Sequence, residues 1–347
     1  MQPGVVPIAT LIPLISLVVL AGAWGALALW VQAPAGRPGT ALCIAMWLGS
    51  AVFLAGGLAG AWPGLLAAGT ALFGGLALLL AVWWLRVEPS NERNWIPEVA
   101  MQTQGVVEGR IVTLRNVRNF HWRGERDFDE RWETRRYDLD TLISVDLALS
   151  YWGRPAIAHA LVSFGFDDGR HVVFSVEIRR KLDDRFSELG GFFRQYELSV
   201  IASDERDSLR VRTNFRGEDS YLFRVHMPRG TMEPLFLSYV EQANKLVNKP
   251  RFYNTITANC TTLIYRMLDP IVPGLPLDYR VLASGYLPEY LYDLNALRGA
   301  DSVAEYRRRG RYTDRARANA DSARFSADIR RGVPGIPAGE AAVPDPD

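Results

Sequence analysis

Only one of the two cysteines in this chain, Cys260, lies in a polar segment, YNTITANCTT at 253–262. The other, Cys43, lies in an uncharged apolar run. A lone cysteine is commonly a small buried hydrophobe, which is the alternative to a reactive thiol here. A nucleophilic cysteine needs a lowered pKa, a base, and a group that orients the base. A catalytic role for Cys260 therefore requires partners from elsewhere in the chain.

The segment NCTTLIYRML predicts a helix that starts at or near Cys260 and ends before Pro270. Its apolar residues recur at helical spacing: Leu263, Ile264, Met267 and Leu268. A helix N-terminus lowers a thiol pKa through its free N–H groups and its partial positive charge. Asn259 or Thr261 could cap this helix. The backbone N–H groups at this point, or the Asn259 amide, could hold an oxyanion, with Tyr253 as a further supporting residue.

The base must be one of four histidines: His121, His159, His171 and His226. His159 opens an apolar stretch, HALVSFGF, that is typical of a strand. The next such stretch, HVVFSVEI, starts at His171. The residues DDGR at 167–170 join the two, and Asp-Gly between alternating segments predicts a β-hairpin.

The second strand of this hairpin carries polar groups on one face. By the period of two, His171 shares its face with Ser175 and Glu177. Glu177 could accept the His159 N–H and so fix the tautomer of the imidazole. Two alternatives stay open, since His159 can be a hydrogen-bonded core residue and Glu177 can pair on the surface with a neighbouring arginine.

Other catalytic schemes find no support in the sequence. It contains no histidine pair at metal-ligand spacing, no Gly-rich phosphate loop and no Gly-x-Ser-x-Gly motif. The paired aspartates of GFDDGR fit a hairpin turn better than calcium binding. We therefore expect no metal and no cofactor. The net charge of +1 also argues against a nucleic-acid partner, which requires a net basic surface.

Residues 1–86 are predicted to be a membrane anchor with three transmembrane helices. Their only charged residues are Arg37 and Arg86. Uncharged stretches run over 1–35, about 40–61 and about 64–85, and each reaches the roughly 20 residues that cross ~30 Å of hydrocarbon. Tryptophans at or near their ends suit the headgroup level: Trp24, Trp30, Trp62, Trp83 and Trp84. A cleaved signal peptide is the alternative for the first stretch, but a basic n-region is missing and the apolar run is too long.

The orientation rests on the number of spans, because the connecting loops carry almost no Lys or Arg. A short N-terminus on the inside and three spans place the residues after 86 on the outer face. The sequence therefore predicts a multi-pass protein of the inner (cytoplasmic) membrane with its C-terminal domain on the periplasmic face. A single cysteine after residue 86 excludes an intramolecular disulfide there.

The rest of the chain is divided into a linker at 87–104, an enzyme domain at 105–298, and an Arg-rich C-terminal segment and tail at 299–347. Alternating Val, Ile and aromatic residues predict an antiparallel sheet in the domain. The charged residues 123–137 are expected to form an irregular, solvated connection, whereas 207–227 shows further β-like alternation. The Arg-rich segment is interpreted as a solvated helix or tail, with binding to anionic lipid headgroups as the alternative.

The periodicity changes at residue 231. In TMEPLFLSYVEQANKLVNKP the apolar residues recur at helical spacing, which predicts an amphipathic helix packed on the sheet. With the helix at Cys260, this gives an α+β fold class for the domain.

Several motifs in a fixed order resemble the DUF4105 family, the periplasmic domain found at the N-terminus of Lnb-type lipoprotein N-acyltransferases. They are NVRNF (116–120), RRYDLD (135–140), HALVSFGFDDGRHVVFSVEIRRK (159–181), SDERD (203–207) and FYNTITANCTTLIYRML (252–268). The similarity spans roughly 90–335 and does not cover the membrane segments.

The resemblance implies a circularly permuted papain-like domain, as in NlpC-like and lecithin:retinol acyltransferase-like enzymes. In that arrangement a histidine on a strand precedes a cysteine on a helix. It implies Cys260 as the nucleophile and His159 as the base. For the third member we favour Glu177 in the SVE stretch, supported by Ser175, with His171 as the alternative.

The activity that the resemblance implies moves an acyl chain within a diacylglyceryl lipoprotein onto its N-terminal amine. We therefore expect a membrane-anchored cysteine acyltransferase or hydrolase that acts on lipoprotein or phospholipid acyl esters through a Cys260 thioester. Its expected partners are membrane lipids and that substrate. A thiol peptidase or amidase on peptidoglycan or exported protein is one alternative, and a non-enzymatic envelope binding module is another. The sequence leaves the acyl donor, the acceptor and the oligomeric state open.

Overall fold

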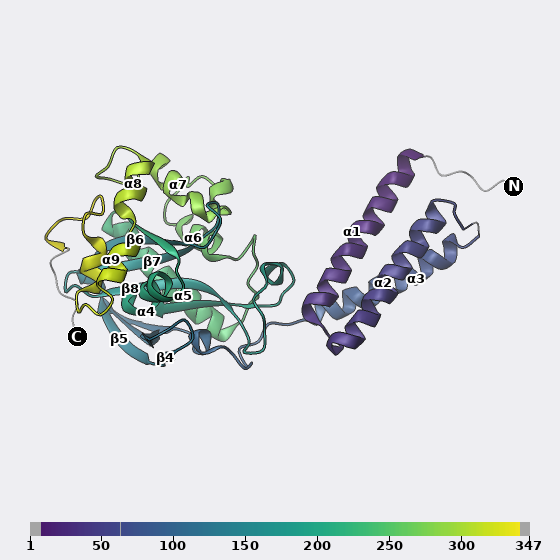
Figure 1. The fold of residues 1–347 in the computed structure, drawn as a ribbon, viewed down its shortest axis with the longest axis horizontal. Helices are drawn as coiled ribbons and strands as arrows, with labels where there is room; N and C mark the ends of the chain where they lie inside the picture. The colour runs from purple at the N-terminus through teal and green to yellow at the C-terminus, as the bar shows by residue number, and fades with distance from the viewer. Residues whose placement is uncertain (1–7, 63, 341–347) are drawn as a thin grey trace. The chain divides into compact units, whose positions relative to one another are not determined.

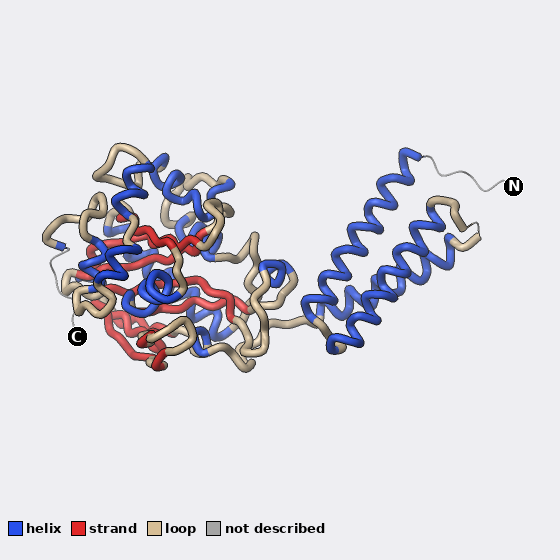
Figure 2. The backbone as a smooth tube through the Cα atoms, viewed as in Figure 1, coloured by secondary structure: helices blue, strands red, loops and turns tan. Residues whose placement is uncertain are grey.

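The structure, a computed structural model, describes residues 8–62 and 64–340. The chain divides into two compact units (Figure 1). One contains the described residues up to Ser90 together with Arg185–Gln195. The other contains Asn91–Asp184 and the described residues from Tyr196 onward. All strands belong to this second unit (Figure 2).

The first unit holds three apolar helices: α1 (Ile8–Gln32), α2 (Gly36–Leu58) and α3 (Leu66–Leu85). Each is long and apolar enough to cross a membrane, which confirms the three predicted spans. The part of the first predicted span before Ile8 lies outside the described residues. Helices α1 and α2 approach closely at Gly22, whose carbonyl accepts the Trp47 indole N–H over 2.9 Å.

The second unit is built on an eight-stranded, mostly antiparallel sheet. Its order is β1-β2-β9-β8-β7-β6-β10, with β5 also paired to β2, and only the β2–β9 pair is parallel. The strands are β1 Gln104–Glu108, β2 Ile111–Arg118, β5 Trp132–Asp138, β6 Leu142–Tyr151, β7 Ala158–Phe166, β8 His171–Arg179, β9 Glu197–Ser203 and β10 Asp219–Arg224. Two short strands, β3 His121–Trp122 and β4 Phe128–Asp129, pair separately.

The predicted hairpin is confirmed as β7 and β8. Their register runs from Leu161 opposite Ser175 to Gly165 opposite His171. The turn residue Gly169 has a φ of +85°, a conformation that favours glycine. Both strands are nearly continuous apolar runs because both faces of the sheet are covered at this point.

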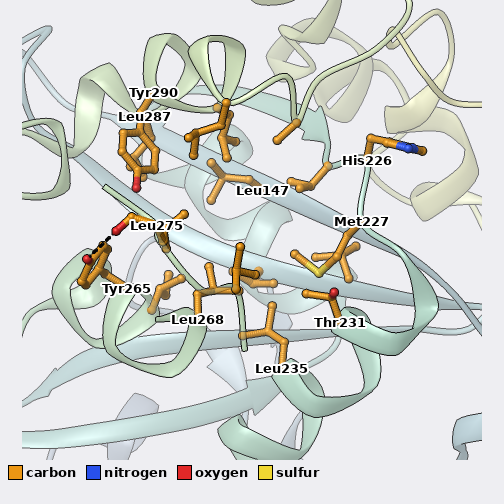
Figure 3. Close-up of a pocket in the computed structure, with 18 of the residues that line it drawn as sticks. Leu147, His226, Met227, Thr231, Leu235, Tyr265, Leu268, Leu275, Leu287 and Tyr290 are labelled. Atoms are coloured by element: carbon orange, nitrogen blue, oxygen red, sulfur yellow. Dashed lines mark hydrogen bonds between the residues drawn. The ribbon is translucent and has the colours of Figure 1, made fainter. Parts of the chain in front are cut away.

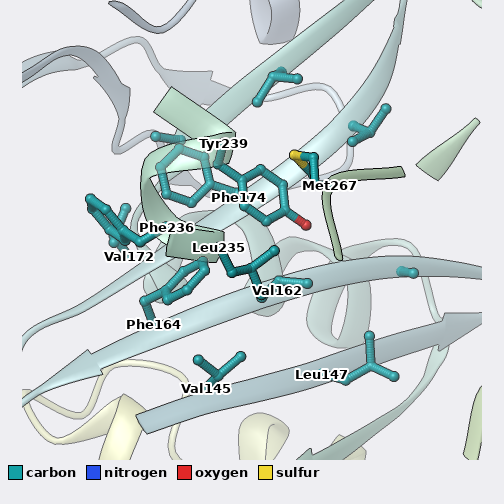
Figure 4. Close-up of a cluster of buried hydrophobic side chains, with 14 of the residues drawn as sticks. Val145, Leu147, Val162, Phe164, Val172, Phe174, Leu235, Phe236, Tyr239 and Met267 are labelled. Carbon is teal, nitrogen blue, oxygen red and sulfur yellow. The ribbon is translucent and has the colours of Figure 1, made fainter. Parts of the chain in front are cut away.

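One face of the sheet is covered by α5 (Arg229–Asn248) and α6 (Cys260–Leu268), which confirms both predicted helices. Figure 4 shows Phe236 and Tyr239 of α5 lying against Phe164 and Phe174 of the central strands. The Phe174 and Tyr239 rings stack at 4.8 Å between centroids. All four rings are fully buried, and each contributes roughly 1.5–3 kcal/mol by leaving water.

The opposite face is covered by short helices that come from two parts of the chain. Leu161 and Val173 of the central strands point to this side and pack in one cluster with Leu209 and Phe325. The helices on this face are α4 Glu205–Arg210, α9 Thr313–Ala318 and α10 Phe325–Arg330, and the chain also forms α7 Leu287–Asp293 and α8 Val303–Gly310. The domain is therefore an α+β fold with helices on both faces of a mostly antiparallel sheet, which confirms the predicted α+β class.

The structure differs from the expectation in two charged regions. Within 123–137, predicted to be irregular, the residues from 132 onward form strand β5, which ends at Asp138; Tyr137 of this strand is buried and its neighbour Arg136 is exposed. Within 207–227, predicted to alternate as strands, the chain first forms α4 and a π-helical turn at Val211–Phe215 and only then β10.

The ends of the domain are also more ordered than a linker and a tail. Asn91 donates to the last carbonyls of α5, at Leu246 and Val247, so the chain packs on the domain soon after it leaves α3. In the Arg-rich segment, Tyr312 and Ile329 are fully buried in the core of the second face. Arg330 of this segment forms buried ion pairs with Asp146 and Glu205, whereas Arg308 and Arg331 remain exposed.

Candidate active site

The site lies where strands β7 and β8 separate. Their pairing ends at Leu161 and Ser175, although β8 continues to pair with β9 as far as Arg179. Two residues further along the same register, His159 would lie opposite Glu177, and both side chains share the face of Ser175. Helix α6 begins here and contacts both strands. The fold therefore brings the first residue of α6, Cys260, to the gap between the two strands.

The start of α6 is held by Asn259, which is the N-cap. Its side-chain oxygen accepts the backbone N–H groups of Thr261 (3.0 Å) and Thr262 (2.8 Å), and the Thr262 hydroxyl accepts the Asn259 N–H (2.9 Å). The Asn259 amide donates to Thr255 O over 2.7 Å. This reciprocal arrangement is a capping box, and it fixes the orientation of Cys260 on the first turn.

His159 is hydrogen-bonded to two polar groups of β8. Its Nε2 lies 2.7 Å from the Ser175 hydroxyl and 3.1 Å from the Glu177 carboxylate. Ser175 in turn donates to the same carboxylate oxygen over 2.6 Å. The imidazole is also hydrogen-bonded to the Cys260 thiol. The structure thus brings Cys260, His159, Glu177 and Ser175 into one connected group.

A residue that sequence reasoning missed completes this group. Arg212 donates to Glu177 over 3.3 Å and to Glu218 over 3.1 Å. It lies on the π-helical turn after α4, and such turns occur often at functional sites. The sequence carried no signal for it, because its stretch shows strand-like alternation and its partner lies 35 positions earlier.

The pKa values of the group are strongly perturbed. Burial and the Arg212 charge lower the pKa of His159, but Glu177 and the hydrogen bond to Cys260 outweigh them and raise it to about 9. Burial raises the pKa of the Cys260 thiol, but the hydrogen bond and charge of His159 and the Ala160 N–H hold it below its ordinary value. Burial likewise opposes ionisation of Glu177, yet His159 and Arg212 keep the pKa of that carboxyl well below its usual range.

These directions define the charge state of the site near neutral pH. The imidazole is protonated and the carboxylate is ionised, and the thiol loses its proton more readily than an ordinary cysteine. A thiolate beside an imidazolium is a nucleophile that needs no prior deprotonation.

Tyr253 lies close to this group. Burial raises the pKa of its hydroxyl, and the nearby negative charges of Cys260 and Glu177 raise it further. The tyrosine therefore stays a neutral hydrogen-bond donor at all physiological pH values. Its backbone N–H donates to Tyr196 O over 3.0 Å, which joins this segment to the start of β9.

The structure does not bring His171 to the site. This residue lies four positions from Ser175 on β8, or about 13 Å along the strand. Its imidazole contacts Gly169 O at 3.0 Å, and burial and the Arg330 charge lower its pKa. The remaining histidines, His121 on β3 and His226 after β10, are not among the groups that surround Cys260.

An apolar cavity of about 550 Å³ runs along the side of α6 (Figure 3). Thr261, Ile264 and Leu268 line it from the helix, and Leu147 and Val162 from the sheet. Its wall is predominantly aliphatic and aromatic, and Thr261 directly follows Cys260 in the chain. The volume is in the range of small-molecule and lipid-chain pockets.

No cluster of three or more His, Cys, Asp or Glu suited to a metal ion occurs among residues 8–62 and 64–340.

Comparison with known protein families gives one match. Residues 128–285 match the model of the Lnb N-terminal periplasmic domain. Comparisons with curated proteins and with solved structures found no significant match. The matched residues include His159, Glu177 and Cys260. The match confirms the resemblance seen in the sequence over residues 128–285, which is narrower than the expected range of 90–335. Three helices of membrane-spanning length followed by a periplasmic-family domain also agree with the predicted localisation. The part of the chain that matches the Lnb N-terminal periplasmic domain, residues 128–285, therefore follows the three apolar helices in the sequence.

Proposed function

We propose that this protein is a membrane-anchored cysteine acyltransferase or hydrolase that acts on acyl esters of lipoproteins or phospholipids on the periplasmic face. The observation that carries the proposal is the hydrogen-bonded group of Cys260, His159 and Glu177 at the N-terminus of α6. Nucleophile, base and orienting carboxylate come from three different elements, which is the arrangement that nucleophilic catalysis requires.

The proposed fold of the domain is a circularly permuted papain-like one. Two features support it: the histidine lies on strand β7 and precedes the cysteine, and the cysteine opens a helix packed against the same sheet. Because His159 Nε2 is hydrogen-bonded to Glu177, Nδ1 is the ring nitrogen that would act on the thiol. A base held by one nitrogen and active through the other keeps a single tautomer.

In the proposed reaction the Cys260 thiolate attacks the ester carbonyl carbon and forms the C–S bond. The oxyanion of the tetrahedral intermediate receives a hydrogen bond from the Cys260 N–H at the helix end, because the N–H groups of Thr261 and Thr262 already donate to Asn259. When the C–O bond breaks, the His159 imidazolium gives its proton to the leaving alkoxide. The acyl group then remains on Cys260 as a thioester.

The second half of the reaction releases the acyl group. An amine, or water in the hydrolase case, attacks the thioester while His159 takes its proton, and the thiolate leaves. Transfer to an amine gives an amide, and transfer to water gives a free fatty acid. Both outcomes use the same residues, so the acceptor decides between transferase and hydrolase.

The apolar cavity beside α6 supports an acyl substrate over a peptide. Its wall offers aliphatic contacts from Ile264 and Leu268 on the helix and from Leu147 on the sheet, and these suit a hydrocarbon chain. A peptide would need backbone donors and acceptors along such a wall.

The test is mass spectrometry of the full-length protein in lipid nanodiscs after incubation with a diacylglyceryl lipopeptide or a diacyl phospholipid. We expect an adduct of one acyl mass on Cys260 that hydroxylamine removes. It should be absent from Cys260→Ser and unchanged in Cys43→Ala, which controls for thiol number. Cleavage of peptidoglycan peptides with no acyl adduct would instead support the peptidase or amidase. No adduct and no cleavage would support a binding module.

A further inference from the structure

The connection between β8 and β9 contains a segment, Arg185–Gln195, that groups with the membrane helices rather than with the sheet. We call it the interfacial segment. Its centre is a short 3₁₀ turn at Glu188–Phe192. The last residue of α1, Gln32, donates its side-chain amide to Phe193 O (2.7 Å) and to Arg194 O (2.9 Å). These bonds attach the segment to the end of the first apolar helix.

Arg194 makes a second attachment, at the end of α3. Its guanidinium donates to Trp84 O (2.7 Å) and to Val87 O (3.2 Å), and it stacks over the Trp84 ring at 4.6 Å. The last carbonyls of a helix lack intrahelical partners and carry partial negative charge. Arg194 satisfies these carbonyls at the point where the chain leaves the apolar helix.

Aromatic rings lie beside these attachments of the interfacial segment to α1 and α3. Trp24 lies 5.2 Å from Trp84 and 6.4 Å from Phe193 between ring centroids. Tryptophan near the ends of membrane-spanning helices prefers the headgroup layer. The interfacial segment therefore contacts α1 and α3 at the depth where the helices enter the headgroups.

The interfacial segment also exposes large apolar side chains. Phe186 is 58% exposed, Leu189 48% and Phe192 42%. We call these three residues, which lie within seven positions, the apolar patch; exposed apolar side chains gathered in this way are costly in water and mark an interaction surface. Because α1 and α3 are membrane-spanning in length and composition, the ends of these helices lie at the surface of a lipid bilayer. The bilayer is therefore the partner that the apolar patch would contact.

We propose that the interfacial segment is a membrane-inserting loop that buries Phe186, Leu189 and Phe192 at the boundary between headgroups and acyl chains. The partner is the lipid leaflet in which α1 and α3 end. Amphipathic segments that present aromatic and aliphatic residues bind such boundaries in this way. This contact is additional to the three spanning helices, and it does not depend on the proposed chemistry.

The position of the interfacial segment in the chain gives it a consequence for the site. Glu177, the carboxylate that holds His159, lies only eight residues before Arg185. Strand β8 therefore runs from the site directly into the lipid-contacting loop.

The test uses the full-length chain in nanodiscs, with Cys43→Ala and Cys260→Ala as the background. Single cysteines at Leu189→Cys or Phe192→Cys carry a bimane label. Val106→Cys is the matched control, because Val106 is 47% exposed on strand β1. Fluorescence is measured with lipids brominated on the acyl chain and, separately, with iodide in the buffer.

We expect brominated lipid to quench labels at positions 189 and 192 at least twofold more than the label at 106, and iodide to show the reverse order. The variant Arg194→Ala should reduce lipid quenching at 189, because it releases the segment from α3. Equal lipid quenching at 189 and 106 would overturn the proposal. Protection of 189 from both quenchers would overturn it too, since protein rather than lipid would then cover the patch.

Discussion

The β7–β8 hairpin carries a histidine at each end, and the two imidazoles have opposite properties. His159 and His171 lie on the same strand pair, and burial lowers the pKa of both. At the His159 end, the charge of Glu177 and the hydrogen bond to Cys260 outweigh burial, and the pKa rises to about 9. The His159 end can therefore hold a proton at neutral pH.

The His171 end contains more carboxylates, yet the pKa of its histidine is lowered. Asp146 and Glu205 both raise the pKa of His171, but burial and the Arg330 charge outweigh them. Arg330 forms ion pairs with both carboxylates, at 2.8 Å and 2.7 Å, so their charge is already neutralised. Net charge at hydrogen-bond distance decides the protonation of a buried histidine, and the number of nearby carboxylates does not.

The largest expected effect follows removal of the proposed nucleophile, which lies at the His159 end of the hairpin. Cys260→Ala should reduce acyl transfer by about 10³-fold or more, because removal of the nucleophile leaves only binding and electrostatic contributions. Cys43→Ala removes a thiol from α2 and should leave the rate unchanged. The measurement is release of labelled fatty acid or labelled amide under steady-state conditions. Equal rates for Cys260→Ala and the unmodified protein would place the reaction elsewhere.

The next effect compares the two histidines directly. His159→Gln should lower kcat by roughly 10²- to 10⁴-fold, the usual contribution of a general base. His171→Gln, at the other end of the same strands, should leave kcat within a factor of about ten. Thermal unfolding of both variants checks that each is folded. A larger loss of kcat in His171→Gln than in His159→Gln would reverse the assignment of the base.

A smaller effect concerns the carboxylate. Glu177→Gln should reduce kcat roughly tenfold to a hundredfold, or ~1.4–2.7 kcal/mol, because a neutral amide stabilises the imidazolium less well. Activity that depends on protonated His159 should fall as the pH rises through about 9. In Glu177→Gln this alkaline limit should move to lower pH. Glu108→Gln, on the exposed strand β1, is the control. A pH profile that does not move would remove Glu177 from the site.

The smallest effect is on stability. His159 has a raised pKa, so its contribution to stability is fully present below its unfolded value of 6.5 and is lost as the pH rises through about 9. His171 has a lowered pKa, so its titration leaves the stability unchanged above its unfolded value of 6.5 and reduces the stability as the pH falls below 6.5. Denaturant unfolding between pH 5 and 9.5 should therefore show changes of opposite sign in His159→Gln and His171→Gln. Parallel changes would contradict the opposite environments.

Much of the site could be predicted because its signals are local. The Asp-Gly turn specifies the β7–β8 hairpin, and the period of two then places Ser175 and Glu177 on one face. The cap at Asn259 and the apolar stripe after it specify α6. A histidine strand and a cysteine helix could thus be recognised separately, and family resemblance suggested that they meet.

The remaining features depend on tertiary contacts that leave no periodic trace. Arg212 and Glu177 come together only because a π-helical turn directs the guanidinium to β8. The Arg-rich C-terminal segment has the composition of a solvated tail. Arg330 is nevertheless buried, because it forms ion pairs with Asp146 in the sheet and Glu205 in α4. Composition describes a charged residue but does not say whether a partner of opposite charge exists inside the fold.

The most direct test of the account is the pH dependence of Cys260 alkylation. Iodoacetamide reacts with the thiolate, and mass spectrometry of the Cys260 peptide reports its rate without any assumption about the substrate. The account predicts that Cys260 titrates below the ordinary thiol pKa of about 8.5, and that His159→Gln moves this titration to higher pH. A Cys260 that titrates at or above that value in the unmodified protein, with no change in His159→Gln, would contradict it.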